Sequence, residues 1–163
     1  MNIFFVDENP RAAARMLVDK HVVKMIVETA QLLASAHHIL EPVDSGDVWT
    51  FKYHAIPKLA YENHPCSVWV RQDRANYMWL LEHGQELCRE YTYRYGKKHS
   101  LEWLFTGVFT APPDNIPDIA FTTPPLCMPN EYHLTLNGVE PFRRAVLSYR
   151  QYYAYGKSHL HAW

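Results

Sequence analysis

One stretch of the sequence places residues that can exchange protons at helical intervals. Their spacings are three or four residues, and they are His21, Lys24, Glu28, Gln31, Ser35 and His38. On a helix this set lies along a single face, while the other residues between 17 and 40 are mostly aliphatic, as is typical of a buried helix. A carboxylate, an ammonium and an imidazole are costly to bury without partners. The set therefore forms either the solvated face of an amphipathic helix or the lining of a polar cleft.

In a cleft, this face would have the groups needed for acid–base chemistry. Glu28 suits a general acid or base, and His21, two turns earlier, suits the positioning of a base or a phosphate. Asp19 lies where it can orient the start of the helix. Lys24 and Gln31 are then candidate substrate-binding residues. We expect Glu28 and His21 to be the catalytic side chains of such a site.

A second pattern occurs twice in the chain. Residues 93–99 and 153–159 share the pattern Tyr-x-Tyr-Gly-Lys-x-His, and each copy lies at the end of a predicted helix. One interpretation is helix capping, in which the glycine is left-handed and the cation meets the helix C-terminus. The other is a nucleic-acid surface, where tyrosine rings stack on bases and Lys or His side chains contact phosphate. The second interpretation makes substrate-binding residues of Tyr153, Tyr155, Lys157 and His159.

Local charge favours the nucleic-acid surface, although the whole chain is nearly neutral. The 16 Lys and Arg residues face 17 Asp and Glu residues, so the formal net charge is −1. This balance excludes binding of nucleic acid or acidic lipid by bulk charge alone. From residue 141 to the end there are four cations and no acid, and Arg71 and Arg74 belong to a second basic stretch. We expect a local basic face that includes Arg71 and Arg74 among the substrate-binding residues.

Other chemistries have weaker support in the sequence. Asn63-His64-Pro65 fits a helix start, with the alternative that His64 enters the cleft and binds substrate. The histidines at 37–38 and at 159 and 161 have no cysteine or carboxylate at ligand spacing beside them. The chain also has no glycine-rich phosphate loop, which argues against a dinucleotide fold. The sequence therefore predicts neither a metal site nor a cofactor.

Three helical segments are expected to position these residues. Residues 10–40 predict one long helix or two abutting helices, residues 65–93 predict a second helix with a C-cap at Gly96, and residues 139–155 predict a final helix that ends at Gly156. Residues 2–7 predict a short strand or an extended arm. Six of the eleven prolines fall between residues 112 and 129, which predicts an extended surface loop.

Together these elements predict a mostly α protein. We expect residues 1–163 to form a single compact helical domain with a central buried helix, a long Pro-rich surface loop and little or no sheet. The three cysteines lack a Cys-x-x-Cys pair and fit small apolar groups in a reducing cytosol. Neither a signal peptide nor a membrane span is expected, so we predict a cytoplasmic monomer.

Three short stretches, in their order and spacing, resemble a known family. Asp19-Lys20-His21 is followed by Glu28, seven residues after the histidine. This resembles the pyrimidine-dimer DNA glycosylases of the phage endonuclease V type, in which an Asp-x-His and a glutamate have the same spacing on a central helix. Asn63-His64-Pro65 is similar to an Asn-His-Pro at the start of a later helix in bacterial relatives. Residues 149–157 are similar to the Tyr-rich tail of the phage enzymes. The chain also resembles phage proteins with the same Met-Asn-Ile-Phe start, which would place it in the host cell cytoplasm.

The resemblance implies a small α-helical base-excision enzyme. In this family the N-terminal α-amine attacks the sugar C1′ and forms an imine, and a glutamate assists glycosyl cleavage and β-elimination. An unperturbed α-amine keeps a useful fraction of free base at neutral pH. The resemblance carries the acid/base role to Glu28 and a positioning role to His21. It places the amine at the Met1–Asn2 end of the chain, on Met1 itself because Asn2 disfavours methionine removal.

Two departures from the family leave other functions open. Val27 and Gln31 stand where the family has arginines flanking the glutamate. Together with the neutral net charge, they favour an enzyme that acts on a free nucleotide or nucleoside in the same cleft. A third alternative is a non-catalytic nucleic-acid-binding protein that uses the Tyr and Lys surface. The expected partner is DNA or a nucleotide.

Overall fold

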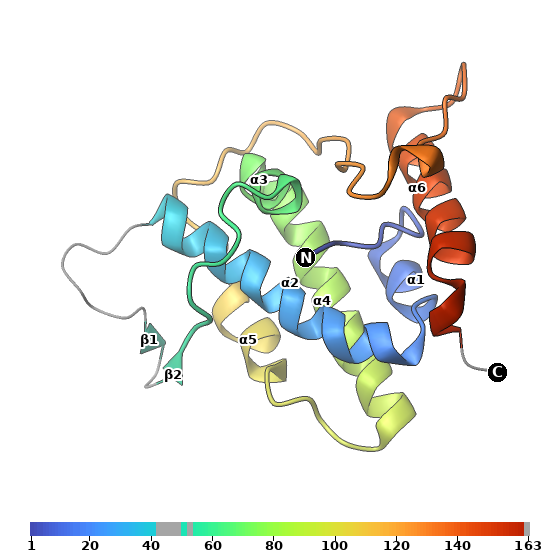
Figure 1. Ribbon diagram of the computed structural model, residues 1–163. Coiled ribbons are helices and arrows are strands. Elements are labelled where there is room, and N and C mark those ends of the chain that lie inside the picture. The colour runs from blue at the N-terminus through green and yellow to red at the C-terminus, as the bar shows by residue number, and fades with distance from the viewer. Residues whose placement is uncertain (42–49, 52–53, 162–163) are drawn as a thin grey trace.

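Two long helices, α2 (Asp19–Leu40) and α4 (Arg74–Tyr95), pack against each other at the centre of the molecule (Figure 1). The computed structural model describes residues 1–41, 50–51 and 54–161. Shorter α-helices surround the central pair, and they are α1 (Pro10–Arg15), α3 (Pro65–Gln72), α5 (Glu102–Thr106) and α6 (Pro141–Gln151). The predicted helix over residues 10–40 is thus two abutting helices.

Little else in the described residues is regular. The 3-10 turns are Val108–Thr110, Asn130–Tyr132 and Ser158–Leu160, and Tyr152–Gly156 is a π-helical turn. Two-residue strands, β1 (Thr50–Phe51) and β2 (His54–Ala55), form one antiparallel pair. The mostly α fold class is confirmed. Among the described residues, no helix combines the length and the hydropathy needed to cross a lipid bilayer.

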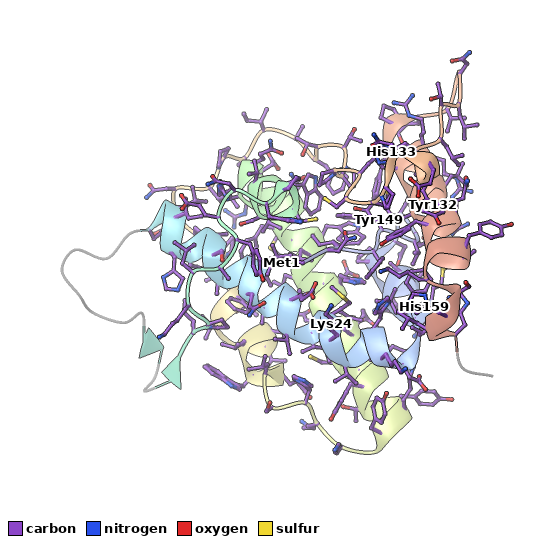
Figure 2. All side chains as sticks on the ribbon, in the orientation of Figure 1. Met1, Lys24, Tyr132, His133, Tyr149 and His159 are labelled. Carbon is purple, nitrogen blue, oxygen red and sulfur yellow. The ribbon has the colours of Figure 1, made fainter. Side chains whose placement is uncertain are left out.

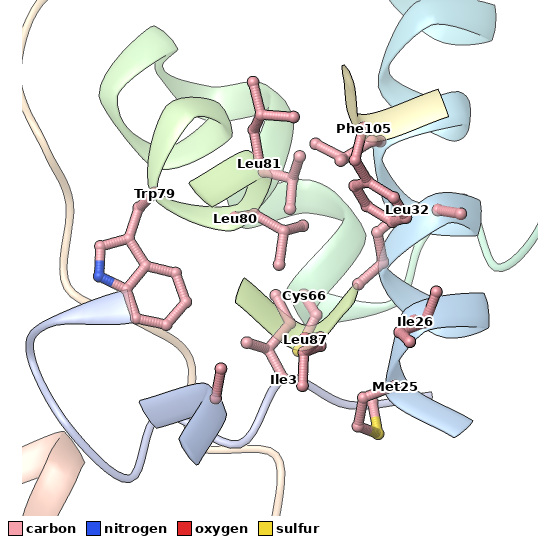
Figure 3. Close-up of a cluster of buried hydrophobic side chains, with 14 of the residues drawn as sticks. Ile3, Met25, Ile26, Leu32, Cys66, Trp79, Leu80, Leu81, Leu87 and Phe105 are labelled. Atoms are coloured by element: carbon pink, nitrogen blue, oxygen red, sulfur yellow. The ribbon is translucent and has the colours of Figure 1, made fainter. Parts of the chain in front are cut away.

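A glycine allows the two central helices to approach closely. A Cβ atom on Gly84 of α4 would overlap the ring of Phe105 and lie 3.0 Å from Cγ2 of Thr29 in α2. Leucine side chains fill the space beside this contact, with Leu80 of α4 and Leu32 of α2 both fully buried (Figure 3). The packing at Gly84 therefore fixes how α2, α4 and α5 fit together.

The chain begins as an extended arm that lies inside the core. The side chains of residues 3–6 are no more than 4% exposed. The ring centroid of Phe5 lies 5.0 Å from that of Trp69, 4.8 Å from that of Trp79 and 5.5 Å from that of Tyr149. Ile3 packs among core side chains of α3 and α4 (Figure 3). This apolar burial holds the first two residues beside α2.

A buried histidine connects α1 to α4. The Nδ1 atom of His83 donates a hydrogen bond to the carbonyl oxygen of Pro10 over 3.0 Å, and the ring stacks on Trp79 with centroids 5.3 Å apart. Burial lowers the pKa of His83 to about 4, so that the ring is neutral at pH 7.

The helix predicted over residues 65–93 is broken at Asp73, where the backbone is extended. The Asp73 carboxylate accepts hydrogen bonds from the backbone N–H groups of Ala75, Ile119 and Ala120, at 2.8, 2.7 and 2.9 Å. Burial alone would raise the pKa of Asp73, but these three donors outweigh burial and lower it. One buried carboxylate therefore caps α4 and anchors the Pro-rich segment, which is the physical reason for the break.

The predicted final helix ends earlier than residue 155. Helix α6 stops at Gln151, and the next turn, Tyr152–Gly156, is wound as a π-helix. A Cβ on Gly156 would overlap the ring of Tyr152, so glycine is needed there for space. Gly96, by contrast, is the predicted left-handed C-cap of α4, with φ of 66°. The two copies of the Tyr-x-Tyr-Gly-Lys-x-His pattern thus use their glycines differently.

The Pro-rich segment is the predicted extended loop. It runs over α3 and the start of α4 before it reaches α6 (Figure 1). The indole Nε1 of Trp69 donates to the carbonyl oxygen of Thr122 over 3.0 Å, and Asn76 Nδ2 donates to Oγ1 of Thr122 over 2.7 Å. Because buried side chains satisfy its backbone, the segment is ordered without secondary structure of its own.

We expect the substitution Asp73→Ala to lower the free energy of unfolding by about 3 kcal/mol, because it leaves three backbone donors without their charged acceptor. Urea denaturation would measure the loss. The exposed Asp118→Ala is the matched control, for which we expect a change within about 0.5 kcal/mol. Equal stability of the two variants would contradict the anchoring role of Asp73.

Candidate functional site

Both ends of the chain meet at one cavity of about 270 Å³, which we name the terminal cavity. Its lining comes from the N-terminal arm, one face of α2, the Pro-rich segment and the π-helical turn. The lining residues are Met1, Asn2, Phe4, His21, Lys24, Met25, Glu28, Cys127, Tyr152 and Lys157. Figure 2 shows Met1 and Lys24 over α2. The cavity therefore depends on residues from the first and last parts of the described chain.

Glu28 forms a hydrogen bond with the N-terminal arm. Its Oε2 atom accepts a hydrogen bond from the backbone N–H of Asn2 over 2.9 Å, and its Oε1 atom lies 3.2 Å from Nζ of Lys24. The Glu28 side chain is only 12% exposed. Asn2 is fixed in turn, because its Nδ2 donates to the carbonyl oxygen of Cys127 over 2.8 Å. A carboxylate thus contacts the nitrogen of residue 2 and has a cation on its other oxygen.

His21 is a buried, neutral imidazole. The Oη atom of Tyr153 accepts the backbone N–H of Val18 over 2.9 Å and lies 2.8 Å from Nδ1 of His21. All three groups are satisfied when the tyrosine hydroxyl donates to Nδ1, which leaves the imidazole proton on Nε2. Burial lowers the pKa of His21 to about 4, helped by the positive charges of Lys157 and Lys24. The ring also stacks on Phe4 at 4.6 Å between centroids, so its orientation is fixed.

Cations and aromatic rings lie together at the cavity. Lys157 Nζ lies 5.2 Å from the ring centroid of Tyr152, which packs against Tyr132 with centroids 5.0 Å apart. Lys24 supplies a second cation from α2, with a side chain that is 67% exposed. Ammonium groups beside an aromatic ring suit a ligand that combines phosphate with a base or a sugar.

The polar face of α2 is not a solvated surface. Ser35 is fully buried, with Oγ donating to the carbonyl oxygen of Ala60 over 3.0 Å, and His38 Nε2 donates to the carbonyl oxygen of Pro57 over 2.9 Å. Residues 56–61 thus cover the second half of this face, while the first half lines the terminal cavity. His21 and Ser35 are buried, Glu28, Gln31 and His38 are half-buried and only Lys24 is exposed, so the set is not a fully solvated face.

Some predicted site residues meet at the terminal cavity and others support it from nearby. Those that line it are Met1, Asn2, His21, Lys24, Glu28 and Lys157. Tyr153 lies behind His21, and Gln31 lies one turn beyond Glu28. His64 is the N-cap of α3, where its Nδ1 accepts the N–H of Cys66 over 3.2 Å. Burial and the positive charge of the chain's amino end lower the pKa of His64, whereas Glu28 raises it.

Besides Gln31, His64 and Tyr153, four more of the predicted substrate-binding residues do not line this cavity. Arg71, in the last turn of α3, donates to the carbonyl oxygen of Glu62 over 2.7 Å, and Arg74 begins α4 on an exposed side. Tyr155 is 73% exposed and His159 is exposed, and neither lines the cavity. Their charge and spacing in the sequence hold no information about which side of the molecule they face.

The sequence analysis missed four residues that line the cavity. Tyr152 belongs to the Tyr-rich tail, and Met25 lies one turn after His21, so both had a detectable signal in the spacing. Phe4 could be recognised only as part of an apolar arm. Cys127 has no local signal, because it reaches the site through the path of the Pro-rich segment.

A larger hollow of about 580 Å³ lies along α4 and is lined in part by Arg11, Glu86 and Arg89. Its charged groups pair with one another, since Glu86 contacts both Arg11, at 3.2 Å, and Arg89. None of the predicted site residues lines it. The terminal cavity is therefore the better candidate for chemistry, despite its smaller volume.

Comparison with known proteins gives one match. The family model of pyrimidine dimer DNA glycosylases matches residues 1–103. This range includes the N-terminal arm, helices α1 to α4 and hence the Glu28 and His21 positions. It excludes Cys127 and the turn with Lys157. Searches of the curated proteins and of the solved structures find no match.

We expect His21 to stay neutral, with the proton on Nε2, until the pH falls to about 4, because its folded pKa is lowered to about 4. The nitrogen shifts of the imidazole, followed by NMR during a pH titration, would show this directly. Tyr153→Phe removes the hydroxyl that fixes the tautomer, so the Nδ1–H form should appear in that variant. A midpoint for His21 at the ordinary imidazole value near 6.5 would contradict this account.

Proposed function

The chain belongs to the pyrimidine dimer DNA glycosylase family, and we propose that its terminal cavity removes a damaged or modified base from DNA. The N-terminal amine is the nucleophile and Glu28 is the general acid and base. The same amine then supports cleavage of the strand at the abasic sugar. The protein needs no cofactor for this chemistry, since an amine and a carboxylate suffice.

The contact between Glu28 and the beginning of the chain carries this proposal. Glu28 Oε2 lies 2.9 Å from the nitrogen of Asn2, and Met1 lines the same cavity. The α-amine of Met1 is one residue further out, and after loss of Met1 the amine would be the Asn2 nitrogen itself. In both cases the residue that bears the amine lines the same small cavity as Glu28, and amine catalysis at a sugar carbon requires the two groups to be close.

The proposed reaction proceeds in balanced steps. The amine lone pair forms a bond to C1′ of the deoxyribose, and the base leaves with the electron pair of the glycosidic bond and takes up a proton. The nitrogen then gives up one proton and forms the C=N bond as the C1′–O4′ bond opens; O4′ keeps the electron pair of that bond and takes up a proton, which leaves a protonated imine. Glu28 removes a proton from C2′, and the 3′ phosphate leaves in the β-elimination. Water finally releases the amine from the sugar.

Neutral His21 and the two lysines fit supporting roles. The Nε2–H group of His21 is a donor that needs no charge to position a sugar or phosphate oxygen. Lys24 and Lys157 bring positive charge to the side of the cavity where the phosphate backbone would lie. These contacts position the substrate, whereas the bond changes belong to the amine and Glu28.

The size of the cavity favours DNA over a free nucleotide. Its volume of about 270 Å³ lies below the roughly 300–1,000 Å³ typical of sites that enclose whole small molecules. One base or one sugar fits, and the rest of the substrate must lie across the surface, as in enzymes that flip a nucleotide out of the duplex. A free nucleotide is the second candidate, favoured by the net charge of −1 and by Val27 and Gln31 beside Glu28.

Borohydride trapping on abasic DNA tests the leading proposal. We expect a covalent adduct that acetylation of the N-terminus abolishes. Glu28→Gln should still form the adduct, but it should slow strand cleavage at the abasic site about 100-fold or more, since it removes the base that takes the C2′ proton. Mass analysis of the linked peptide would identify Met1 or Asn2 as the source of the amine.

Glu82→Gln, at an exposed position of α4, is the matched control and should form the adduct and cleave the strand at the normal rates. An adduct on a lysine, or no adduct, would contradict the amine mechanism. Thermal protection by a nucleotide but not by abasic duplex would support the free-nucleotide alternative instead.

A further inference from the structure

Two cysteines and a histidine from distant parts of the sequence meet beside the terminal cavity. The Sγ atoms of Cys66 and Cys127 lie 3.5 Å apart, and both thiols are free. One ligand atom from each of His64, Cys66 and Cys127 lies within 4.8 Å of the other two. Within the described part of the chain, this is the one group of three such side chains at metal-binding distances.

The spacing of these atoms is that of neighbouring metal ligands. A disulfide would place the two sulfurs about 2.05 Å apart, much closer than they are. Around a tetrahedral Zn²⁺ with Zn–S bonds of about 2.3 Å, two thiolates lie about 3.8 Å apart. The observed 3.5 Å needs only a small outward movement to reach this value.

We propose that His64, Cys66 and Cys127 form a binding site for a metal ion that prefers thiolate ligands, namely Zn²⁺. Two thiolates and one imidazole are a ligand set that zinc prefers, and three protein ligands leave a fourth position open. That position faces Asn2, whose Oδ1 lies 3.9 Å from Cys66 Sγ. On binding, each thiol that coordinates releases its proton to solvent.

The surroundings suit a site that an ion can enter but not easily leave. Cys66 is fully buried in the first turn of α3, so one ligand is shielded from solvent. Cys127 is half-buried and lines the terminal cavity, which provides the entry path. His64 is held by its capping hydrogen bond, in which Nδ1 accepts the N–H of Cys66 over a long 3.2 Å that an ion can replace.

An ion in this site would join three segments that otherwise meet only through packing and hydrogen bonds. His64 and Cys66 belong to the start of α3, Cys127 belongs to the Pro-rich segment, and Asn2 belongs to the N-terminal arm. The site borders the terminal cavity through Cys127, but neither Glu28 nor His21 is among its ligands.

Direct metal binding by the reduced, EDTA-treated, full-length protein tests the proposal without any DNA. With Zn²⁺ as the probe, we expect one ion per chain in competition with a chromophoric chelator and an upward shift in Tm. With Co²⁺ as the probe, we expect the near-ultraviolet charge-transfer band of two thiolates and the visible absorption of a tetrahedral site.

Two variants and one control make the test specific. Cys127→Ser should weaken Zn²⁺ binding by about 100-fold or more and halve the charge-transfer band. His64→Asn keeps a side-chain oxygen that can cap α3 but lacks the imidazole, so it should weaken binding while the metal-free Tm stays nearly unchanged. Cys88→Ala, which removes a buried thiol outside the cluster, should bind like the original chain.

The proposal is overturned if the reduced protein binds no Zn²⁺ at micromolar concentrations. It is also overturned if Cys127→Ser and Cys88→Ala bind the ion equally well. Circular dichroism of each variant confirms that a loss of binding is not a loss of folding.

Discussion

Burial of the N-terminal arm is the constraint on which the cavity depends. Each fully buried apolar side chain of residues 3–6 contributes about 1.5–3 kcal/mol, enough together to offset the ordering of a chain end that would otherwise fray. Phe5 is surrounded by rings from α3, α4 and α6, so the arm also joins these helices. Because Ile3 cannot move, Asn2 and Met1 stay beside α2, and a terminal amine can serve as a fixed reactive group.

The polar groups of the terminal cavity each have a partner or a protonation state that offsets the cost of their burial. Glu28 has the Asn2 N–H on one oxygen and Lys24 on the other, whereas His21 avoids charge altogether by remaining neutral next to two cations. A charged His21 would compete with the lysines for the same carboxylate. In the proposed reaction a neutral ring would leave the lysines to contact the phosphate, so the proposed chemistry and the stability of the site favour the same protonation states.

The periodicity of α2 was enough to predict the helix and the group that contains His21, Lys24 and Glu28, because local spacing alone determines a helix face. The break at Asp73 could not be predicted, since its partners lie 46 and 47 residues further along the chain. The contact between Cys66 and Cys127 could not be predicted for a similar reason, because the irregular Pro-rich segment brings together two residues that are 61 positions apart. Arg71 was predicted to bind substrate because of its positive charge, but it donates to the carbonyl oxygen of Glu62 and does not line the terminal cavity.

The neutral histidines have a consequence for how the molecule takes up protons. Burial lowers the pKa of His21 and His83 to about 4 in the folded chain, whereas an unfolded histidine has its ordinary value near 6.5. Unfolding therefore binds protons between these two values, so both histidines favour the folded state above pH 6.5, and this contribution is lost as the pH falls towards 4. Mild acid thus weakens the fold through two buried, neutral rings.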